Sequence, residues 1–470
     1  MQQVESENKM PLAAAEQVYG SVLQREVRTE VDKLDWPPLA ARGWAPLPTS
    51  AGVLQPEEGA RRGGVGECDG GCGQSDDSKI SNDSREDGGG IRLKFLTWNV
   101  LCDGLSGAHP ERGGFLMAPE GSLDWEQRRW KLLEEILRWD CDVLVLQEVD
   151  HHHDWLSPML AKEGYRSLFV KKPIAPGMAF NPHLEDGCSL FYRVMNGGGG
   201  AGKPAAIGGQ RSDGRDSVEM KTLDLLDAHT FTLAVAEKDD DNATKETNGE
   251  SEPQKNERLG EPVAGNQVAL ISLLRVSSAG SSSGGEGGEG GEDGKEALVI
   301  VTTTHLKAAK NAHGEVIRAR QAKQLLDEVA RFRAGHAQAR GLPVESIHLI
   351  VAGDFNATPH RSGDYDPLCY QQVRAHPLAL RSAMPVDDDF FTTWKIRPSR
   401  PPPGNDAMGV KQGATRESKH CIDYVWVSDR VEPTRGSTLP SGEELGPSRA
   451  PSFVYPSDHF AIAVDLRLPH

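Results

Sequence analysis

The chain has 470 residues, of which 37% are hydrophobic, and it carries 51 glycines and 30 prolines. Because globular proteins contain roughly 45–50% apolar residues, this composition excludes a chain that packs throughout its length. The net charge of −17 argues against a broadly basic nucleic-acid-binding protein, although residues 1–90, 237–262 and 277–295 carry −7, −5 and −3 of it and leave about −2 for the rest. A basic phosphate-binding surface is therefore compatible with the remaining sequence.

The cysteine content and the N-terminal sequence favour an intracellular location. Seven cysteines in a long chain favour a reduced, intracellular protein. No apolar run approaches the roughly 20 residues of a membrane helix, and the polar, acidic stretch Met1–Met10 does not resemble a signal peptide. We therefore expect an intracellular monomer, most simply cytoplasmic, without a membrane partner; a mitochondrial or other organellar location stays open.

Residues 1–90 are predicted to form a disordered leader. A weak helical pattern covers only Leu12–Leu34, and clusters of Pro, Gly and Asp follow it. Ordered sequence is predicted to begin at Ile91 and to continue as a single α/β domain over 91–470.

Strand and helix patterns alternate within this domain. Apolar residues at helical spacing predict a helix over Trp125–Trp139, with Asp124 as its N-cap, and a second helix over Glu315–Phe332. Short apolar runs predict strands. The predicted strands are Ile91–Trp98, Asp142–Leu146, Ser189–Arg193, Phe231–Ala236, Gln267–Val276, Ala297–Thr304, Ile347–Ala352, Ile422–Val427 and His459–Leu466.

Five segments between these elements are rich in Gly, Ser, Pro or acidic residues and lack periodicity. We interpret them as solvated insertions in one domain. They lie near 197–216, 237–262, 277–295, 398–417 and 431–452.

Polar residues lie at the ends of several predicted strands. Because strand ends in a layered α/β fold converge on one rim, side chains that are far apart in the sequence are expected to meet there. The residues concerned are Asn99, Glu148, His305, Asp354, Asn356, Asp423, Asp458 and His459.

The oxygen ligands in this set predict a site for a hard cation. Mg²⁺ takes one or two protein carboxylates and fills its other positions with water and substrate phosphate. Glu148 is the candidate metal ligand, while Asn99, Asp354 and Asn356 can hold the metal's shell or the phosphate. The sequence has no Cys/His cluster of the kind that binds zinc. It also has no Gly-x-x-x-x-Gly-Lys-Ser/Thr loop of the kind found in enzymes that are driven by nucleotide hydrolysis.

The histidines add general acid–base chemistry to this site. His459 and Asp423 can form a pair in which the carboxylate fixes the tautomer and orientation of the imidazole. His305 can donate to a phosphate oxygen. Each of these residues alone is more often a turn or capping residue, so their joint occurrence carries the prediction.

Six short motifs resemble the endonuclease/exonuclease/phosphatase superfamily in kind and in order. They are Thr97-Trp98-Asn99-Val100, Leu146-Gln147-Glu148-Val149, Thr304-His305, Gly353-Asp354-Phe355-Asn356, Ile422-Asp423-Tyr424 and Ser457-Asp458-His459. The resemblance implies an α/β fold in which two sheets form a four-layered sandwich with helices outside.

This resemblance also implies roles for the site residues. Glu148 would be the principal Mg²⁺ ligand, with Mn²⁺ as a second metal choice, and His459 would be the catalytic histidine, oriented by Asp423. The residues implied to surround the metal and the scissile phosphate are Asn99, Asp354, Asn356, His305 and Asp458.

Within the superfamily, the sequence is similar to the nocturnin and deadenylase branch. The similar stretches include Trp125-Glu126-Gln127-Arg128, Asp186-Gly187-Cys188, His305-Leu306-Lys307-Ala308, Glu315-x-x-Arg318-x-x-Gln321 and Thr392-Thr393-Trp394-Lys395-Ile396-Arg397. This similarity implies removal of the 2′-phosphate of NADP(H). The alternative is a 3′–5′ exoribonuclease acting on poly(A) RNA, and a remote alternative is a non-catalytic nucleotide- or RNA-binding protein.

Five basic residues are the candidates for contact with substrate phosphates. Arg suits bidentate phosphate contacts, whereas Lys acts as a point charge. The candidates are Lys172, Lys307, Arg318, Lys395 and Arg397. One departure bears on the substrate, because nocturnin has an Arg two positions after the Lys that corresponds to Lys307. Here that position is Ala309, and Lys310 follows it.

Overall fold

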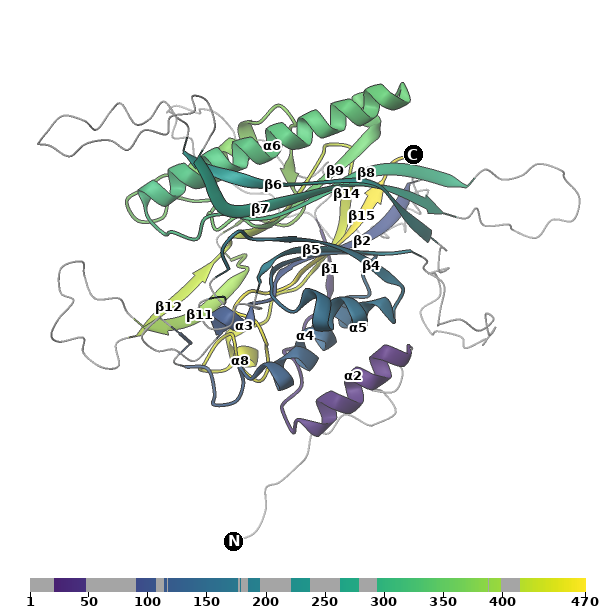
Figure 1. Cartoon of the computed structure of the whole chain (residues 1–470). Helices are drawn as coiled ribbons and strands as arrows, with labels where there is room; N and C mark the ends of the chain where they lie inside the picture. The colour runs from purple at the N-terminus through teal and green to yellow at the C-terminus, as the bar shows by residue number, and fades with distance from the viewer. Residues whose placement is uncertain are drawn as a thin grey trace, which may run out of the picture.

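Two β-sheets pack face to face, and helices cover their outer surfaces (Figure 1). The computed structural model describes residues 21–47, 90–106, 114–115, 117–175, 178, 185–194, 221–236, 263–278, 294–387, 389–398 and 415–470. The predicted four-layered α/β sandwich is confirmed. The proposed insertions at 197–216 and 237–262 lie outside the described residues, as do the interiors of 277–295 and 398–417. None of the helices in the described ranges combines the length and the apolar composition needed to cross a bilayer.

The first sheet has seven strands. Their order across the sheet is β1 (Trp44–Pro46), β14 (Glu432–Ser437), β15 (Ile462–Leu468), β2 (Ile91–Asn99), β3 (Val143–Val149), β5 (Gly187–Arg193) and β4 (Tyr165–Lys171). β2 and β3 run parallel, and the other pairs are antiparallel. On this side of the sandwich lie the helical elements α2 (Val22–Lys33), α3 (Asp103–Ser106), α4 (Trp125–Trp139), a π-helix (His152–Leu156), α5 (Ser157–Ala161) and α8 (Gly442–Leu445) (Figure 1).

The second sheet has six strands. Their order is β10 (Arg381–Ser382), β13 (Asp423–Val427), β9 (Ile347–Asp354), β8 (Lys295–His305), β7 (Val263–Ser278) and β6 (Lys221–Ala236). Only β8 and β9 run parallel. The helix α6 (Ala312–Arg340) lies across the outer face of this sheet (Figure 1), a 3-10 turn (Val344–Ser346) follows it, and α7 (Leu368–Ala375) packs beside it. A separate hairpin is formed by β11 (Thr393–Pro398) and β12 (Thr415–His420).

Apolar side chains form one core between the sheets and one beneath each helical layer. The central core contains Val145 of β3 and Ile350 of β9, both fully buried. Leu133 of α4 belongs to the outer core on one side, and Leu325 of α6 to that on the other. The buried faces of the two sheets therefore fix their relative position, and the site described below lies at one end of this sandwich.

Two segments that we predicted to be disordered or inserted are ordered, so those predictions are wrong. Within the expected leader 1–90, residues 21–47 form α2 and β1 and pack onto the domain. Leu23, Val27 and Val31 recur every four residues and are buried against the core beneath α4. The expected insertion at 431–452 contains β14, which pairs with both β1 and β15.

Arg42 ties the N-terminal segment to the rest of the domain. Its side chain is fully buried and its Nη1 donates to Glu135 Oε1 at 2.8 Å and to Tyr455 Oη at 2.9 Å. Its Nε donates to the carbonyl of Thr438 at 2.8 Å, and its Nη2 donates to the carbonyl of Ala461. Ala461 lies two residues after His459, so the N-terminal segment supports the chain that leads from the site into β15.

We expect Arg42→Ala to lower the free energy of unfolding by about 3 kcal/mol, because it leaves the buried Glu135 with fewer partners. Chemical denaturation of the full chain measures this change. The matched control is Lys33→Ala on α2, where an exposed pair with Glu30 contributes less than about 0.5 kcal/mol. Equal denaturation midpoints for the two variants would contradict the conclusion that the N-terminal segment is an integral part of the folded domain.

Candidate functional site

The ends of strands from both sheets meet at one end of the sandwich. Asp354, at the end of β9, lies beside His305 of β8 on one side and Asp423 of β13 on the other. Asn99, at the end of β2, reaches across from the first sheet. Its Nδ2 donates to Glu148 Oε1 at 2.9 Å and to Asp354 Oδ2 at 3.0 Å. A single amide therefore links carboxylates that are 206 positions apart in the sequence.

The backbone is strained where it presents these side chains. Glu148 has a φ of 55° and lies in an irregularity where β3 pairs with β5. Asn356 has a φ of 53°. Non-glycine residues rarely adopt this left-handed region, and such strain is concentrated at functional sites. Gly353 precedes Asp354 with a φ of 141°, and a Cβ there would lie 2.1 Å from the carbonyl oxygen of Thr304. Only glycine allows β8 and β9 to approach so closely at the site.

Glu148, His305 and Asp354 form a cluster whose ligand atoms all lie within 4.8 Å of one another. His305 Nδ1 is 3.9 Å from Glu148 Oε1, and His305 Nε2 is 3.5 Å from Asp354 Oδ2. All three residues are buried. The two carboxylates offer the oxygen ligands that a hard divalent cation prefers, and the amide nitrogen of Asn99 holds them together, so this pair fits the predicted metal. Burial is the main cause that lowers the pKa of His305, and Lys172 adds to it, which favours a neutral imidazole.

Asp423 and His459 form the predicted carboxylate–histidine pair. His459 Nδ1 lies 2.9 Å from Asp423 Oδ2, and His459 Nε2 faces Asp354 Oδ2 at 3.9 Å. The hydroxyl of Thr392 donates to Asp423 Oδ2 at 2.5 Å and holds the carboxylate in place. Burial alone would lower the pKa of His459, but Asp423 and Asp458 outweigh it and raise this pKa to about 9. The imidazole is therefore protonated at neutral pH and can donate a hydrogen bond from Nε2.

Asp458 links the histidine to two cations of the β11 strand. Its Oδ2 lies 3.9 Å from His459 Nε2, forms an ion pair with Lys395, and accepts from Arg397 Nη2 at 3.4 Å. Burial would raise the pKa of Asp458, but Lys395 and His459 lower it well below its usual range. The Arg397 guanidinium also lies over the ring of Phe115, at 4.2 Å from its centroid. Both predicted basic residues of β11 are thus brought to the site.

Lys172 lies on the other side of the site. Its Nζ is 2.6 Å from Asp186 Oδ2 and 3.5 Å from His305 Nδ1. Burial would lower the pKa of Lys172, but Asp186 and Glu148 outweigh it and raise the pKa. This buried cation therefore remains charged beside the cluster, as a residue that contacts a substrate phosphate would require. Asp186, the carboxylate partner of Lys172, was not predicted as a site residue.

The loop between β8 and α6 carries two further lysines. Lys310 Nζ donates to Asn356 Oδ1 at 3.1 Å and to the carbonyl of Asn356 at 3.0 Å, so this cation reaches the site although Ala309 does not supply one. Lys307 is half-buried, and its ammonium has no hydrogen-bond or ion-pair partner within the described ranges. Of the two loop lysines, Lys307 is thus the one whose ammonium has no protein partner among the described residues.

Arg318 does not contact the site, so its prediction as a substrate-binding residue is wrong. Its side chain is fully buried in α6, where Nη2 donates to Glu315 Oε2 at 2.6 Å and Nη1 donates to the carbonyl of Lys307 at 2.9 Å. The spacing Glu315-x-x-Arg318 contributed to the resemblance to the nocturnin and deadenylase branch, but it gave no information on whether the side chains are buried.

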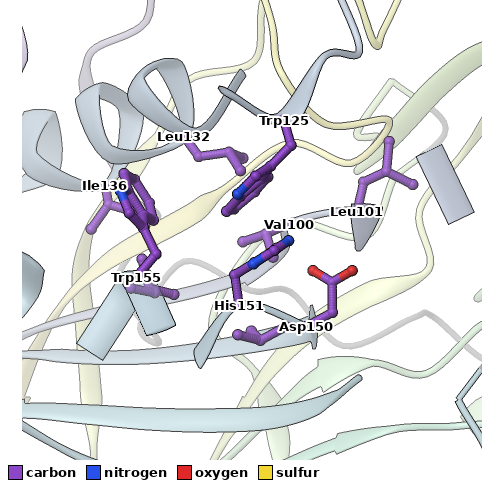
Figure 2. Close-up of a pocket in the computed structure, with 10 residues that line it drawn as sticks. Val100, Leu101, Trp125, Leu132, Ile136, Asp150, His151 and Trp155 are labelled. Atoms are coloured by element: carbon purple, nitrogen blue, oxygen red, sulfur yellow. The ribbon is translucent and has the colours of Figure 1, made fainter. Parts of the chain in front are cut away.

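A pocket beside the strand end of Glu148 contains none of the predicted site residues. Its lining is Val100, Leu101, Trp125, Leu132, Ile136, Val149, Asp150, His151, Trp155 and Leu156 (Figure 2). Trp125 stacks on His151 with ring centroids 4.0 Å apart, and Asp150 accepts from the amide of Gly104 at 3.1 Å. Because this lining is mostly apolar and contains no Lys or Arg, it does not suit a phosphate group.

Comparison with known proteins finds one matching family and several similar proteins. The Endonuclease/Exonuclease/phosphatase family model matches residues 96–459. Nocturnin of Xenopus laevis is 28% identical to this chain over 384 residues, which cover 80% of this chain and 72% of that protein. The matches to the rat, mouse and human nocturnins cover 65% of the length of each of those proteins. The CCR4-Not complex 3′-5′-exoribonuclease subunit Ccr4 of Yarrowia lipolytica is 24% identical over 79% of this chain and 47% of its own length. The solved human nocturnin catalytic domain with bound sulfate superposes with a TM-score of 0.48 at 23% identity, over 80% of this chain and 94% of that chain.

Proposed function

The chain belongs to the endonuclease/exonuclease/phosphatase family, and from this membership we propose that it is a Mg²⁺-dependent phosphoester hydrolase that removes the 2′-phosphate of NADP(H). The observation that carries the proposal is the ring of cations around one compact carboxylate–histidine cluster. Lys172, Lys310 and Lys395 each place an ammonium within hydrogen-bond or ion-pair distance of a residue of this site. Several cations around one small centre suit the closely spaced phosphates of a dinucleotide.

The residues that would hold the metal are Glu148, Asp354 and His305, with Asn99 keeping the two carboxylates together. The carboxylate oxygens of Glu148 and Asp354 suit both Mg²⁺ and Mn²⁺. When bound, the cation supplies Lewis-acid polarisation of a phosphoryl oxygen.

The chain's own residues then carry the proton chemistry. His459, charged and oriented by Asp423, donates a hydrogen bond to a phosphoryl oxygen as negative charge develops there. Asp354 or Asn356, whose backbone amide donates to Asp354 Oδ1 at 2.8 Å, orients the attacking water, which displaces the ribose 2′-oxygen in line. The water oxygen bonds to phosphorus while the bond between phosphorus and the ribose oxygen breaks. Inorganic phosphate is released, and the proton that the water loses balances the proton that the ribose oxygen takes up.

The similarity to nocturnins and the position of Lys310 support this substrate. Where the nocturnin pattern has an Arg, this chain has Ala309, and the following Lys310 brings its ammonium to Asn356 at the site. The cation is therefore supplied from the next position in the loop.

A 3′–5′ exoribonuclease acting on poly(A) RNA is the second candidate. The similarity to Ccr4, which extends over 79% of this chain, favours it. The hairpin of β11 and β12 adds exposed cations such as Arg416 and Lys419 beside the site, which suit an extended polyanion. A non-catalytic binding protein is less well supported, because the cluster of Glu148, Asp354 and His459 is complete.

The proposed function is tested by incubating the full chain with Mg²⁺ and either NADPH or 5′-labelled poly(A). We expect free phosphate from NADPH, none from NADH, and loss of release in excess EDTA that added Mg²⁺ restores. Mn²⁺ in place of Mg²⁺ tests the second metal. Shortening of poly(A) without turnover of NADPH would overturn the proposal in favour of the exoribonuclease.

A further inference from the structure

A buried ion pair lies behind the loop that joins β8 to α6. Glu315 and Arg318 occupy the first two turns of α6, one helical turn apart, with exposed side-chain fractions of 1% and 0%. Arg318 Nε and Nη2 donate to Glu315 Oε2 at 2.9 and 2.6 Å. The second carboxylate oxygen of Glu315 accepts from the amide of Cys369 at 2.8 Å, which fastens the pair to α7.

The third nitrogen of this guanidinium, Nη1, holds the loop. Arg318 Nη1 donates to the carbonyl of Lys307 at 2.9 Å and to that of Ala309 at 2.5 Å. The amide of Lys307 donates to Gln321 Oε1 at 3.1 Å, one turn further along α6. The loop backbone between His305 and Asn311 is therefore fixed from inside the protein, while the ammonium of Lys310 is directed at Asn356.

The loop is also fixed on the side of the site. The amide of Leu306 donates to the carbonyl of Asp354 at 2.9 Å, and Asn356 Nδ2 donates to the carbonyl of Leu306 at 3.2 Å. Gly314, in the first turn of α6, lets the loop close against the helix, because a Cβ there would lie 2.3 Å from the carbonyl oxygen of Ala309. The backbone of Lys307 thus lies between the proposed metal site and the buried pair.

We propose that Arg318, held by Glu315, is a positioning residue that fixes the loop backbone so that Lys307 and Lys310 meet the substrate phosphates; this inference rests on the proposed function. Arg318 touches no substrate itself. Both charges of a buried ion pair lose their solvation. Apolar residues of similar volume therefore commonly stabilise a fold as much as a buried ion pair does. The planar fork of arginine suits this place because Nε and Nη2 meet the carboxylate while Nη1, on the other side of the fork, meets two carbonyls; a lysine ammonium concentrates its donors on one nitrogen.

The first test is Arg318→Lys in the full chain, with kcat and KM measured for phosphate release from NADPH. This substitution retains the charge opposite Glu315 and removes the fork. We expect KM to rise about tenfold with kcat changed less than about threefold, because the loop serves binding while the cluster remains in place. Gly314→Ala displaces the carbonyl of Ala309 without altering the ion pair and is expected to raise KM in the same way. This second variant keeps the test decisive if Arg318→Lys does not fold.

The matched control is Arg331→Lys, which alters a Glu–Arg pair of the same spacing, Glu328–Arg331, on the exposed face of α6. Its KM is expected to equal that of the wild type. An unchanged KM in both Arg318→Lys and Gly314→Ala, measured on folded protein, would overturn the inference.

A double-mutant cycle separates positioning from general destabilisation. If Arg318 acts through the two lysines, Arg318→Lys adds less than about twofold to KM in a Lys307→Ala/Lys310→Ala background. A full tenfold increase in that background would show that Arg318 acts by another route. Failure of the proposed function is recognised separately, since the wild type would then release no phosphate from NADPH. If the wild type releases no phosphate from NADPH, the same variants are compared with poly(A) as the substrate. The same rise in KM for Arg318→Lys and Gly314→Ala is then expected.

Discussion

Replacing His459 with alanine is expected to lower kcat for phosphate release from NADPH by about 10³-fold, because general acid and hydrogen-bonding groups of this kind contribute 10²–10⁴-fold. His459 Nδ1 is fixed by Asp423 at 2.9 Å, and its Nε2 faces the cluster 3.9 Å from Asp354 Oδ2. Steady-state kinetics at saturating Mg²⁺ and NADPH measure the loss. A variant that retains more than about a tenth of wild-type kcat would remove His459 from the mechanism.

The control for this substitution is another buried histidine with a carboxylate partner. His376 Nε2 lies 3.2 Å from Asp327 Oδ1, beside α6 and away from the cluster. We expect His376→Ala to retain kcat within about threefold, because it removes a similar pair without altering the site. Equal losses in both histidine variants would indicate destabilisation of the fold as the common cause.

The charge on His459 also predicts a pH dependence. Burial lowers its pKa, yet Asp423 and Asp458 raise it to about 9, so the imidazolium persists to that pH and is lost above it. We expect kcat to fall as the pH rises through about 9. Asp423→Asn removes the carboxylate that raises the pKa of His459 most. The fall in kcat at alkaline pH should therefore move to lower pH in this variant. A fall at the same pH in wild type and Asp423→Asn would contradict the assignment of this fall to His459.

Local patterns predicted the elements that form the interior of the fold. The helix at Trp125–Trp139 has the bounds predicted from its apolar spacing, and the strands leading to Asn99, Glu148 and Asp354 were placed within a few residues. These elements are apolar over most of their length, so their burial is determined by local sequence. The residues at their ends could therefore be identified as neighbours before their contacts were known.

Elements that depend on distant partners were missed. β1 has three residues and pairs with β14, about 390 positions later in the chain, so no local pattern indicates it. α2 was predicted only as a weak pattern, since the low-complexity sequence beyond residue 47 dominates the composition of the N-terminal region. β14 contains Pro433 and Gly436, which are unfavourable in a strand interior, and a register irregularity at Pro433 accommodates the proline.

Burial separates two basic residues that the sequence treated alike. Lys307 and Arg318 both lie in family-like stretches, but the ammonium of Lys307 has no hydrogen-bond or ion-pair partner in the described part of the chain, whereas Arg318 is enclosed with Glu315. A motif reports which residue types occur together and not the direction in which they point. The burial of Arg318 depends on how α6 packs on the second sheet and on α7.

Replacing Glu148 with glutamine is expected to lower phosphate release from NADPH by at least about 10³-fold, because the proposed metal ligand is lost and with it the proposed polarisation of the phosphoryl oxygen. Glutamine has nearly the same volume and can still accept from Asn99 Nδ2. The free energy of unfolding without metal should therefore change by less than about 1 kcal/mol. Glu134→Gln, which alters a buried carboxylate of α4 paired with Lys131, serves as the control outside the site.

The most direct test of metal-dependent phosphoester hydrolysis at this cluster measures free phosphate from NADPH with Mg²⁺ for the wild type, Glu148→Gln and Glu134→Gln. Release by the wild type and Glu134→Gln, with at least about a 10³-fold loss in Glu148→Gln, is the result we predict. Release that survives in folded Glu148→Gln at more than about a tenth of the wild-type rate would contradict the assignment of the reaction to this site.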